Sequence, residues 1–396
     1  MISAGIWAGL GAGAVAAAGV AQAVLGALAV RRFTALPRPA PGARPSVTVL
    51  KPLHGNEPML EAALESFFLQ DYPDYQIVFG VQSPTDPAIA VVRTLRHRFP
   101  ARDVTLVIDS ARHGMNQKIS NVVNMLAVAR HDVLVLSDSD VHAAPDYLDR
   151  VVATLAQPGT GVVTTLYTGV AAGGAVAQTL GASHITHTFL PGALLARALG
   201  RQDCLGATMA VRRETLRELG GFAALADHLA DDAMLGRLAR LHGLAVRLAP
   251  TVPGTTVPET TLSTLVSHEM RWARTIRSLA PAGHVMSLIQ FPLAWAMLAV
   301  LLSGGARWAL GLMAVAWVGR YAACRAVDAA LGGRRHMAFA LLPLRDWLSA
   351  AEVLASLRGR QVRWRGEILP VGRPLDDLRR HAETAYRASQ PALGEG

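Results

Sequence analysis

Cysteine is scarce in this chain, whose 396 residues include only Cys204 and Cys324. The two lie far apart and match no metal-binding spacing, so the sequence predicts neither a zinc site nor a disulfide framework. Charge is also sparse. Only 17% of the residues are charged and 51% are hydrophobic, which is too apolar for an ordinary soluble enzyme. We therefore expect part of the chain to lie in lipid.

The first thirty residues, Met1 to Val30, contain no charged side chain, and Arg31 and Arg32 follow directly. This run is long enough to cross a bilayer, which takes about 20 residues. A cleaved signal peptide carries its positive charges before the apolar core, whereas here they follow it. We expect an uncleaved transmembrane anchor over residues 1–32. The positive-inside rule then places the following residues in the cytoplasm, beginning with a proline-rich linker at 33–45.

The chain has no aromatic-interleaved basic stripe, although its formal net charge is +9. Much of the basic excess lies beside apolar segments, as at Arg334, Arg335 and residues 358–365. Such placement is typical of cations facing anionic lipid headgroups. We interpret the basic balance as membrane topology and expect no nucleic-acid partner.

Residues 46–258 alternate β-rich apolar runs with amphipathic helical patterns, which indicates parallel βαβ units. The expected strands are 47–53, 77–81, 104–108, 133–137, 162–167, 204–211 and 246–249, and the expected helices are 57–69, 87–99, 116–129 and 145–156. The sequence therefore predicts an α/β catalytic domain with a Rossmann-like, mostly parallel sheet.

The pattern changes after Pro258. Residues 259–283 predict an amphipathic helix at the membrane interface. Residues 284–303 and 308–327 predict a transmembrane hairpin that turns at Gly304 and Gly305. The third apolar stretch, 336–357, is interrupted by charges that are costly in hydrocarbon unless they are paired or face protein. We expect it to be re-entrant or interfacial, followed by a basic cytoplasmic tail at 358–396.

Asp138 and Asp140 follow the apolar run Val133 to Leu136. Two carboxylates one residue apart at the carboxyl end of a buried strand can chelate a divalent cation, where such sheets bind nucleotides. Asp-x-Asp also caps turns and helices, and the motif alone does not separate the two interpretations.

Asp86 and Lys118 each follow another expected strand and precede a helix. Asp86 is placed to cap its helix, and also to accept from a uracil or ribose donor. Lys118 closes the loop His113-Gly-Met-Asn-Gln-Lys118, where a helix amino terminus and a lysine favour an anion such as a diphosphate. Each feature is also common in purely structural loops.

Asp231 and Asp232 are adjacent carboxylates in a region rich in Ala and Leu. They suit the first turn of a helix, and Asp232 is also our candidate for the general base of a group transfer.

Further candidates lie in the apolar and amphipathic segments. Arg271 and Trp272 can anchor a helix at the interface, or bind a pyrophosphate and wall off a sugar. His184 is a candidate for lining an acceptor channel, or is simply a satisfied polar group.

In chain order these features form one combined signature that spans nearly the whole sequence: Val81-Gln82…Asp86-Pro87-Ala88, Gly114-x-Asn116-x-Lys118, Asp138-Ser-Asp140, Gly181-x-Ser183-His184, Asp231-Asp232 and His268-x-x-Arg271-Trp272. The set resembles the ceramide glucosyltransferase-like family of inverting GT-A glycosyltransferases, and among bacterial members the hopanoid-biosynthesis glycosyltransferases.

The resemblance implies roles for individual residues. Asp86 would bind the nucleotide, Asp138 the metal, Asp232 would be the base, and Arg271-Trp272 would complete the donor site. Three positions stand apart from the family pattern. His268 stands where the family usually has Gln or Arg, Asp231 where it commonly has Glu, and Asp140 where relatives often lack a carboxylate. Asp140 is then a second metal ligand or a helper through water.

The resemblance also implies the reaction partners. The donor would be a UDP-sugar, UDP-N-acetylglucosamine, used with Mg²⁺ or Mn²⁺. The acceptor would be a lipid hydroxyl, that of bacteriohopanetetrol, reached from the bacterial cytoplasmic membrane. A ceramide acceptor with UDP-glucose is the alternative within the family. A non-catalytic membrane scaffold or transporter is the alternative of another class, in which the carboxylates would be mere caps.

Overall fold

The computed structural model describes residues 4–37, 42–333, 338–359, 361–364 and 367–370. The described chain divides into two compact units. The sheet unit comprises residues 37–167 and 202–256, and the helical unit comprises residues 1–36, 168–201 and 257–371. Residues 168–201, which lie inside the expected catalytic domain, thus group with the helices. Part of the expected linker and most of the expected tail lie outside the described residues.

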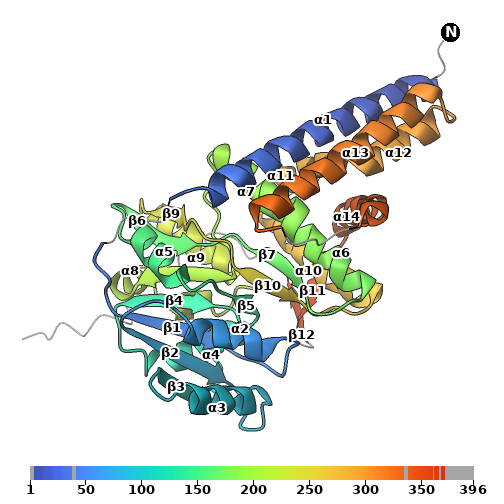
Figure 1. Cartoon of the computed structure of the whole chain (residues 1–396). Coiled ribbons are helices and arrows are strands. Elements are labelled where there is room, and N and C mark those ends of the chain that lie inside the picture. The colour runs from blue at the N-terminus through green and yellow to red at the C-terminus, as the bar shows by residue number, and fades with distance from the viewer. Residues whose placement is uncertain (1–3, 38–41, 334–337, 360, 365–366, 371–396) are drawn as a thin grey trace, which may run out of the picture. The chain divides into compact units, whose positions relative to one another are not determined.

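The sheet unit is built around a seven-stranded sheet in the order β3-β2-β1-β4-β8-β6-β9 (Figure 1). Neighbouring strands are parallel except at β8, which is antiparallel to both β4 and β6. The strands are β1 (Val47–Pro52), β2 (Tyr75–Val81), β3 (Asp103–Ile108), β4 (Val133–Ser137), β6 (Thr160–Thr164), β8 (Thr208–Arg212) and β9 (Ala245–Leu248). The expected mostly parallel sheet is confirmed, and each expected strand overlaps an observed one.

Helices cover the sheet, and two short strands, β5 and β10, pair antiparallel beside it. The bounds of these elements are α2 (Leu60–Phe68), α3 (Ala88–Arg98), α4 (Gln117–Leu126), β5 (Val141–His142), α5 (Tyr147–Leu155), α8 (Arg213–Glu218), η2 (Phe222–Leu225), α9 (Asp231–Leu241) and β10 (Gly254–Val257).

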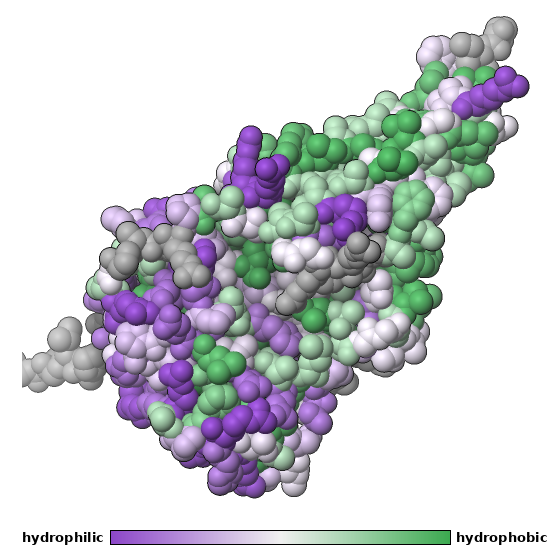
Figure 2. Space-filling model, viewed as in Figure 1, coloured by the Kyte–Doolittle hydropathy of each residue, from purple (hydrophilic) through white to green (hydrophobic). Residues whose placement is uncertain are grey.

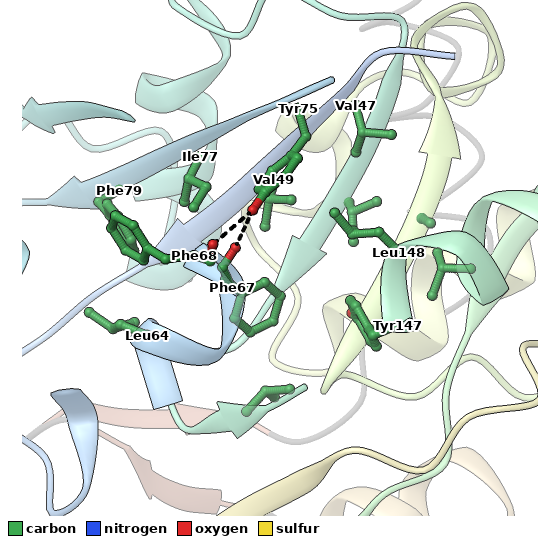
Figure 3. Packing of buried hydrophobic residues seen from close by; sticks show 14 of the residues in the cluster. Val47, Val49, Leu64, Phe67, Phe68, Tyr75, Ile77, Phe79, Tyr147 and Leu148 are labelled. Carbon is green, nitrogen blue, oxygen red and sulfur yellow. Dashed lines mark hydrogen bonds between the residues drawn. The ribbon is translucent and has the colours of Figure 1, made fainter. Parts of the chain in front are cut away.

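The core on one face of the sheet is aromatic (Figure 3). Phe67 and Phe68 at the end of α2 point toward the strand side chains, and the Phe68 ring stacks on Phe79 with centroids 6.0 Å apart. The Tyr75 hydroxyl donates to the Phe67 carbonyl at 3.0 Å. Its polar end is thereby satisfied within the core, as burial of a hydroxyl requires. This packing fixes the strands whose carboxyl ends carry the candidate site.

The helical unit contains the apolar helices (Figures 1 and 2). Its elements are α1 (Ala4–Thr34), β7 (Thr168–Ala171), α6 (Val176–His184), the π-helix η1 (Ile185–Phe189), α7 (Leu190–Ala198), α10 (Leu262–Leu279), α11 (Pro281–Met286), η3 (Ser287–Gln290), α12 (Pro292–Leu302), α13 (Arg307–Ala330), η4 (Phe339–Leu341), α14 (Leu342–Ser356), β11 (Gln361–Trp364) and β12 (Glu367–Pro370).

Two of these helices, α1 and α13, are long and apolar enough to cross a membrane. Together with α12 they form an elongated bundle. Its surface in Figure 2 is largely apolar. The exposed apolar side chains of these helices include Leu25 and Val315. Small residues bring the helices close. A Cβ added to Gly19 of α1 would lie only 2.4 Å from the Ile289 carbonyl oxygen. Such close backbone approach is typical of membrane helix pairs.

The expected span over 284–303 is interrupted by a break between η3 and α12. The helices from Pro281 to Gln290 and from Pro292 to Leu302 are bent by 71°. Pro292 has no N–H to continue the preceding helix, but it fits the first turn of a new one. Counted as one broken span, the pair brings the candidate spans to three among the described residues. Gly304 and Gly305 form the expected turn with positive φ.

The charges that interrupt the third apolar stretch lie inside the helical unit, on α14. Arg345 is 1% exposed. It makes a bidentate ion pair with Glu269 of α10, with N–O distances of 3.0 and 2.9 Å. It also contacts Glu352 at 3.1 Å. The neighbouring Asp346 pairs with Arg320 of α13 at 3.4 Å. These charges are therefore paired and face protein rather than lipid.

Replacing Arg345 with Met is expected to destabilise the helical unit, because Glu269 and Glu352 would lose their shared cation. Removing one partner of a buried ion pair costs about 3–5 kcal/mol. Thermal unfolding of the purified protein, followed by tryptophan fluorescence, should show a clearly lower midpoint. Arg358→Met, which changes an exposed residue just after the same helix, is the control and should leave the midpoint nearly unchanged. Equal midpoints for both variants would contradict a stabilising role for Arg345.

Candidate active site

The candidate carboxylates of the sheet unit gather where its central strands end. Strands β2, β1 and β4 are adjacent and parallel, with Pro52 opposite Gly80 and Leu50 opposite Leu136. Their carboxyl ends therefore open at one edge of the sheet. Asp138 follows β4 directly, and Asp86 follows β2. This edge is where open α/β sheets bind their ligands.

Lys118 joins two of the candidate carboxylates. Its Nζ lies 2.7 Å from Asp138 Oδ1 and 3.4 Å from Asp231 Oδ2. Burial lowers the pKa of the Lys118 ammonium, but Asp138 and Asp231 more than offset this and raise it. Lys118 is therefore a fixed positive charge between segments that are more than ninety residues apart in the sequence.

The loop that carries Lys118 is fastened to the segment before α9. Asn116 caps α4 by accepting from the Ile119 amide at 3.1 Å. Its own amide donates to the His228 carbonyl at 2.8 Å and to Asp231 Oδ1 at 3.3 Å. Gly114 approaches this segment so closely that an added Cβ would lie 2.6 Å from the Ala226 carbonyl oxygen. Gly114 thus allows two backbone segments to approach each other closely.

Asp231 and Asp232 open α9, as expected for acidic residues in a first turn. Asp232 Oδ1 accepts from the Ala233 amide at 2.7 Å. Burial, and then the neighbouring Asp231, raise the pKa of Asp232 to about 7. A carboxylate that titrates near neutrality has the basicity that a general base needs. The negative field of Asp232, Asp138 and Asp140 adds to burial in raising the pKa of the Tyr167 hydroxyl, so these groups share one neighbourhood.

Asp140 lies two residues after Asp138, and the two carboxylates interact electrostatically. Burial and then the Asp138 carboxylate raise the pKa of Asp140 to about 6. The Thr255 hydroxyl donates to Asp140 Oδ2 and holds the carboxylate in place. Two carboxylates that repel each other this strongly would be stabilised by a cation between them.

The Asp86 carboxylate accepts hydrogen bonds both at the start of α3 and from the loop after β1. Its Oδ1 accepts from the Ala88 amide at 2.9 Å at the start of α3. Both oxygens also accept from the Gly55 amide, at 3.1 and 3.0 Å. The capping interpretation of Asp86 therefore holds. A carboxylate oxygen accepts more than one bond, so the cap leaves a nucleotide contact available.

The sequence reasoning missed Lys51, the next-to-last residue of the buried strand β1. Its Nζ donates to the Ser137 hydroxyl at 3.4 Å and to the Asp138 carbonyl. It also lies 3.8 Å from the centroid of the Phe67 ring. Burial lowers the pKa of Lys51 to about 7, against the opposing pull of Asp140 and Asp138. A lysine directly after the apolar run Val47 to Leu50 was the available signal.

Glu57 is a second missed residue. Its carboxylate accepts from the Ser139 hydroxyl at 2.7 Å, which fixes the middle residue of the Asp138-Ser-Asp140 run. Nothing in the sequence pairs these two positions, because their contact depends on how the loop after β1 folds back.

Four predicted site residues lie in the helical unit. Arg271 and Trp272 are on α10, where the Trp272 ring meets His268 edge-on with centroids 4.4 Å apart. His268 also contacts the Glu259 carboxylate. His184 ends α6 and contacts the Ser349 hydroxyl at 3.2 Å, within the polar network around Arg345. Their part in the site remains a prediction.

The carboxylates suit a divalent cation whose coordination shell is completed by the substrate. In the part of the chain that the structure describes, no group of three or more His, Cys, Asp and Glu side chains is placed to hold a metal. Mg²⁺ is commonly held by one or two carboxylates together with substrate phosphates. Asp138 and Asp140 supply such a pair, and Lys118 adds a further positive charge for phosphate oxygens.

A family profile described as glycosyl transferase family 21 matches residues 12–374, most of the chain. The chain belongs to this family. The resemblance drawn from the ordered motifs is thereby confirmed at the family level.

Curated relatives align with part of this chain. Ceramide glucosyltransferase 3 of Caenorhabditis elegans is 28% identical over 198 residues, covering 49% of this chain and 42% of that protein. Ceramide glucosyltransferase of Komagataella phaffii is 31% identical over 121 residues, covering 30% of this chain and 24% of that protein. The chain thus matches less than half the length of these relatives.

A solved structure supports the fold. The mannosyltransferase PcManGT from Pyrobaculum calidifontis, in complex with GDP-Man and Mn²⁺, has a TM-score of 0.51 and 22% identity. The likeness covers 88% of this chain and 97% of that one. The family 21 chain therefore has a GT-A-type fold, as expected.

We expect Mn²⁺ to bind this family 21 protein weakly alone and at least about fivefold more tightly when UDP is present, because phosphate oxygens would complete its coordination. Electron paramagnetic resonance of free Mn²⁺ measures this directly. Asp140→Asn should weaken the UDP-dependent binding, whereas Asp132→Asn, at a side chain that is 97% exposed, should not. Tight binding without UDP would show that the protein alone forms the metal site.

Proposed function

We propose that this chain transfers a sugar from a UDP-sugar to the hydroxyl of a membrane lipid, with inversion at the anomeric carbon. The observation that carries the proposal is the convergence of Asp138, Lys118 and Asp232 at the ligand-binding edge of the sheet. Membership of family 21 and the apolar helices of the helical unit support it.

The donor would bind with its diphosphate at Asp138, Asp140 and Lys118. A divalent cation held there supplies Lewis-acid stabilisation of the charge that develops on the departing UDP. Lys118 adds a fixed ammonium next to Asp138. Asp86 lies at the same edge and would bind the nucleoside, and Arg271 and Trp272 are our further candidates for donor binding.

Asp232 would act as the general base. It would take the proton of the acceptor hydroxyl as the hydroxyl oxygen bonds to the anomeric carbon. The bond from that carbon to UDP breaks on the opposite face, so the product has inverted configuration. The carboxylate is suited to the role because its raised pKa makes it a stronger base than an ordinary aspartate.

We propose UDP-N-acetylglucosamine as the donor and bacteriohopanetetrol as the acceptor, at the bacterial cytoplasmic membrane with the sheet unit facing the cytoplasm. The ordered motifs, which resemble those of hopanoid-biosynthesis enzymes, support this choice. UDP-glucose with a ceramide acceptor is the second candidate, and the curated relatives named ceramide glucosyltransferase favour it.

Sugar transfer by the purified protein tests this proposal. Incubation with radiolabelled UDP-sugars and extracted lipids should give a glycolipid that mass spectrometry identifies, and EDTA should abolish its formation. Asp138→Ala should lose transfer yet remain folded and membrane-inserted. A membrane scaffold or transporter would instead keep its function in this variant and form no glycolipid.

The pH dependence of kcat/KM tests the base. Since Asp232 acts only as a carboxylate and its pKa is raised to about 7, the active form is lost as pH falls. Below that pKa we expect kcat/KM to fall about tenfold per pH unit, at constant saturating metal. Asp232→Asn should reduce kcat by about 10²–10⁴-fold and remove this acidic limb from the residual rate. An unchanged acidic limb in the variant would assign the proton to another group.

A further inference from the structure

The helical unit contains a cavity, lined in part by polar side chains, that the proposed chemistry does not use. It is lined by residues from four segments: Gln22 of α1, the η1–α7 segment, Gln290 of η3 and Arg320 of α13. Its volume is about 240 Å³ with the space at its mouth included. Most of this is the open mouth, and the enclosed part has room for about one water-sized group, such as a hydroxyl.

Gln22 is the unusual member of this lining. It is the only polar residue apart from Trp7 between Ala4 and Val30, in a helix that is apolar enough to cross a membrane. Its Oε1 atom is buried and accepts no hydrogen bond from the described residues. A buried carbonyl oxygen without a donor is costly, and polar groups within membrane helices commonly serve a function.

The cations of the cavity are already balanced. Arg320 pairs with Asp346 and donates to the His187 carbonyl and to the Thr188 hydroxyl, both at 2.9 Å. His187 itself contacts Asp328 at 2.9 Å. With these charges paired, the cavity has little net attraction for an anion such as phosphate. The group that remains unsatisfied is Gln22 Oε1, which needs a hydrogen-bond donor.

The position of Gln22 along α1 argues for the same class of ligand. It precedes Arg31 by nine residues, which is about 13 Å along a helix that rises 1.5 Å per residue. Arg31 and Arg32 mark the membrane interface by the positive-inside rule. A charged phosphate is strongly disfavoured at that depth, whereas a lipid hydroxyl or amide is tolerated when it is hydrogen-bonded.

The second glutamine is brought into the wall by a glycine. A Cβ added to Gly192 of α7 would lie 2.4 Å from Gln290 Oε1. Gly192 therefore leaves the space that the Gln290 side chain occupies, at the break between η3 and α12. The cavity thus presents two amide side chains, Gln22 and Gln290, that are far apart in the sequence.

We propose that this cavity binds a neutral hydroxyl or amide group of the lipid acceptor, other than the hydroxyl that receives the sugar. It would act as a specificity site, with Gln22 Oε1 accepting the hydrogen bond. The inference rests on the proposed transfer to a lipid, but the binding itself can be measured without turnover.

Photo-crosslinking of the full chain in phosphatidylcholine nanodiscs tests the site. The probes are a ceramide and a polyhydroxylated hopanoid, each with a diazirine beside its polar head, and a phosphatidylglycerol with the same group. We expect the first two to label peptides around Gln22 or Pro191, in competition with the unlabelled lipid. Equal labelling by phosphatidylglycerol would indicate a general lipid site and overturn the inference, as would absence of competable labelling.

Gln22→Met keeps the length of the side chain and removes the acceptor, and it suits an apolar span. Loss of one hydrogen bond should lower competable labelling about threefold to tenfold and raise the KM for the lipid by a similar factor. The KM for the UDP-sugar should not change. Gly11→Ala is the control on the same helix, because a Cβ there meets nothing within 4 Å. Unchanged labelling in Gln22→Met would overturn the role of Gln22.

The two proposals fail separately. Competable labelling without any sugar transfer would leave the lipid site standing and overturn the proposed reaction. Sugar transfer to a lipid without labelling at this cavity would do the reverse.

Discussion

The contact on which the sheet unit's candidate site depends is the bridge from Lys118 to Asp138 and Asp231. It connects the end of β4, the start of α4 and the start of α9, which the chain delivers from separate βα units. The carboxylates in this neighbourhood include those of Asp138, Asp140, Asp231, Asp232 and Glu57, and the buried ammonium groups include those of Lys118 and Lys51. The carboxylates exceed the cations, so the cluster favours the arrival of a further positive charge.

A comparable constraint acts in the helical unit, where burial makes each charge depend on its partner. Arg345 contacts Glu269 and Glu352, and Ser349 links it to His184. Glu269 precedes Arg271 by two residues on α10. The clamp on Glu269 therefore also fixes the rotation of the helix that carries the Arg271-Trp272 pair. Buried ion pairs add little net stability over apolar packing, so a role in orientation is the better explanation for this arrangement.

Much of the fold could be predicted because hydrophobic patterning reports burial. The apolar runs that became β1, β2 and β4 are buried on both faces, and each is followed by an amphipathic helix. Patterning carries no strand direction, so the antiparallel course of β8 was not visible. It also marked 284–303 as one span, since Pro292 is compatible both with a kink and with a new helix.

The site was predictable only in part. Residues that follow local rules could be found from the sequence, whereas charged residues buried by tertiary packing could not. Asp138 and Asp232 stood out because carboxylates at strand ends and in first turns follow local rules. Lys51 did not, because its burial against Phe67 and the Ser137 hydroxyl depends on the packing of α2 on the sheet. The cavity at Gln22 was equally hidden. A lone glutamine in an apolar run shows its importance only when Gly192, Gln290 and Arg320 are seen around it.

The balance of charge at the sheet edge also bears on how a cation would be accepted there. Asp140 has its pKa raised to about 6 and Lys51 has its pKa lowered to about 7, so both sit close to a change of protonation near neutrality. A bound divalent cation favours the carboxylate form of Asp140 and disfavours the ammonium form of Lys51, so both effects release protons. Lys118 differs, because Asp138 and Asp231 hold it charged. The site thus combines one permanent cation with groups whose charge adjusts when a cation binds.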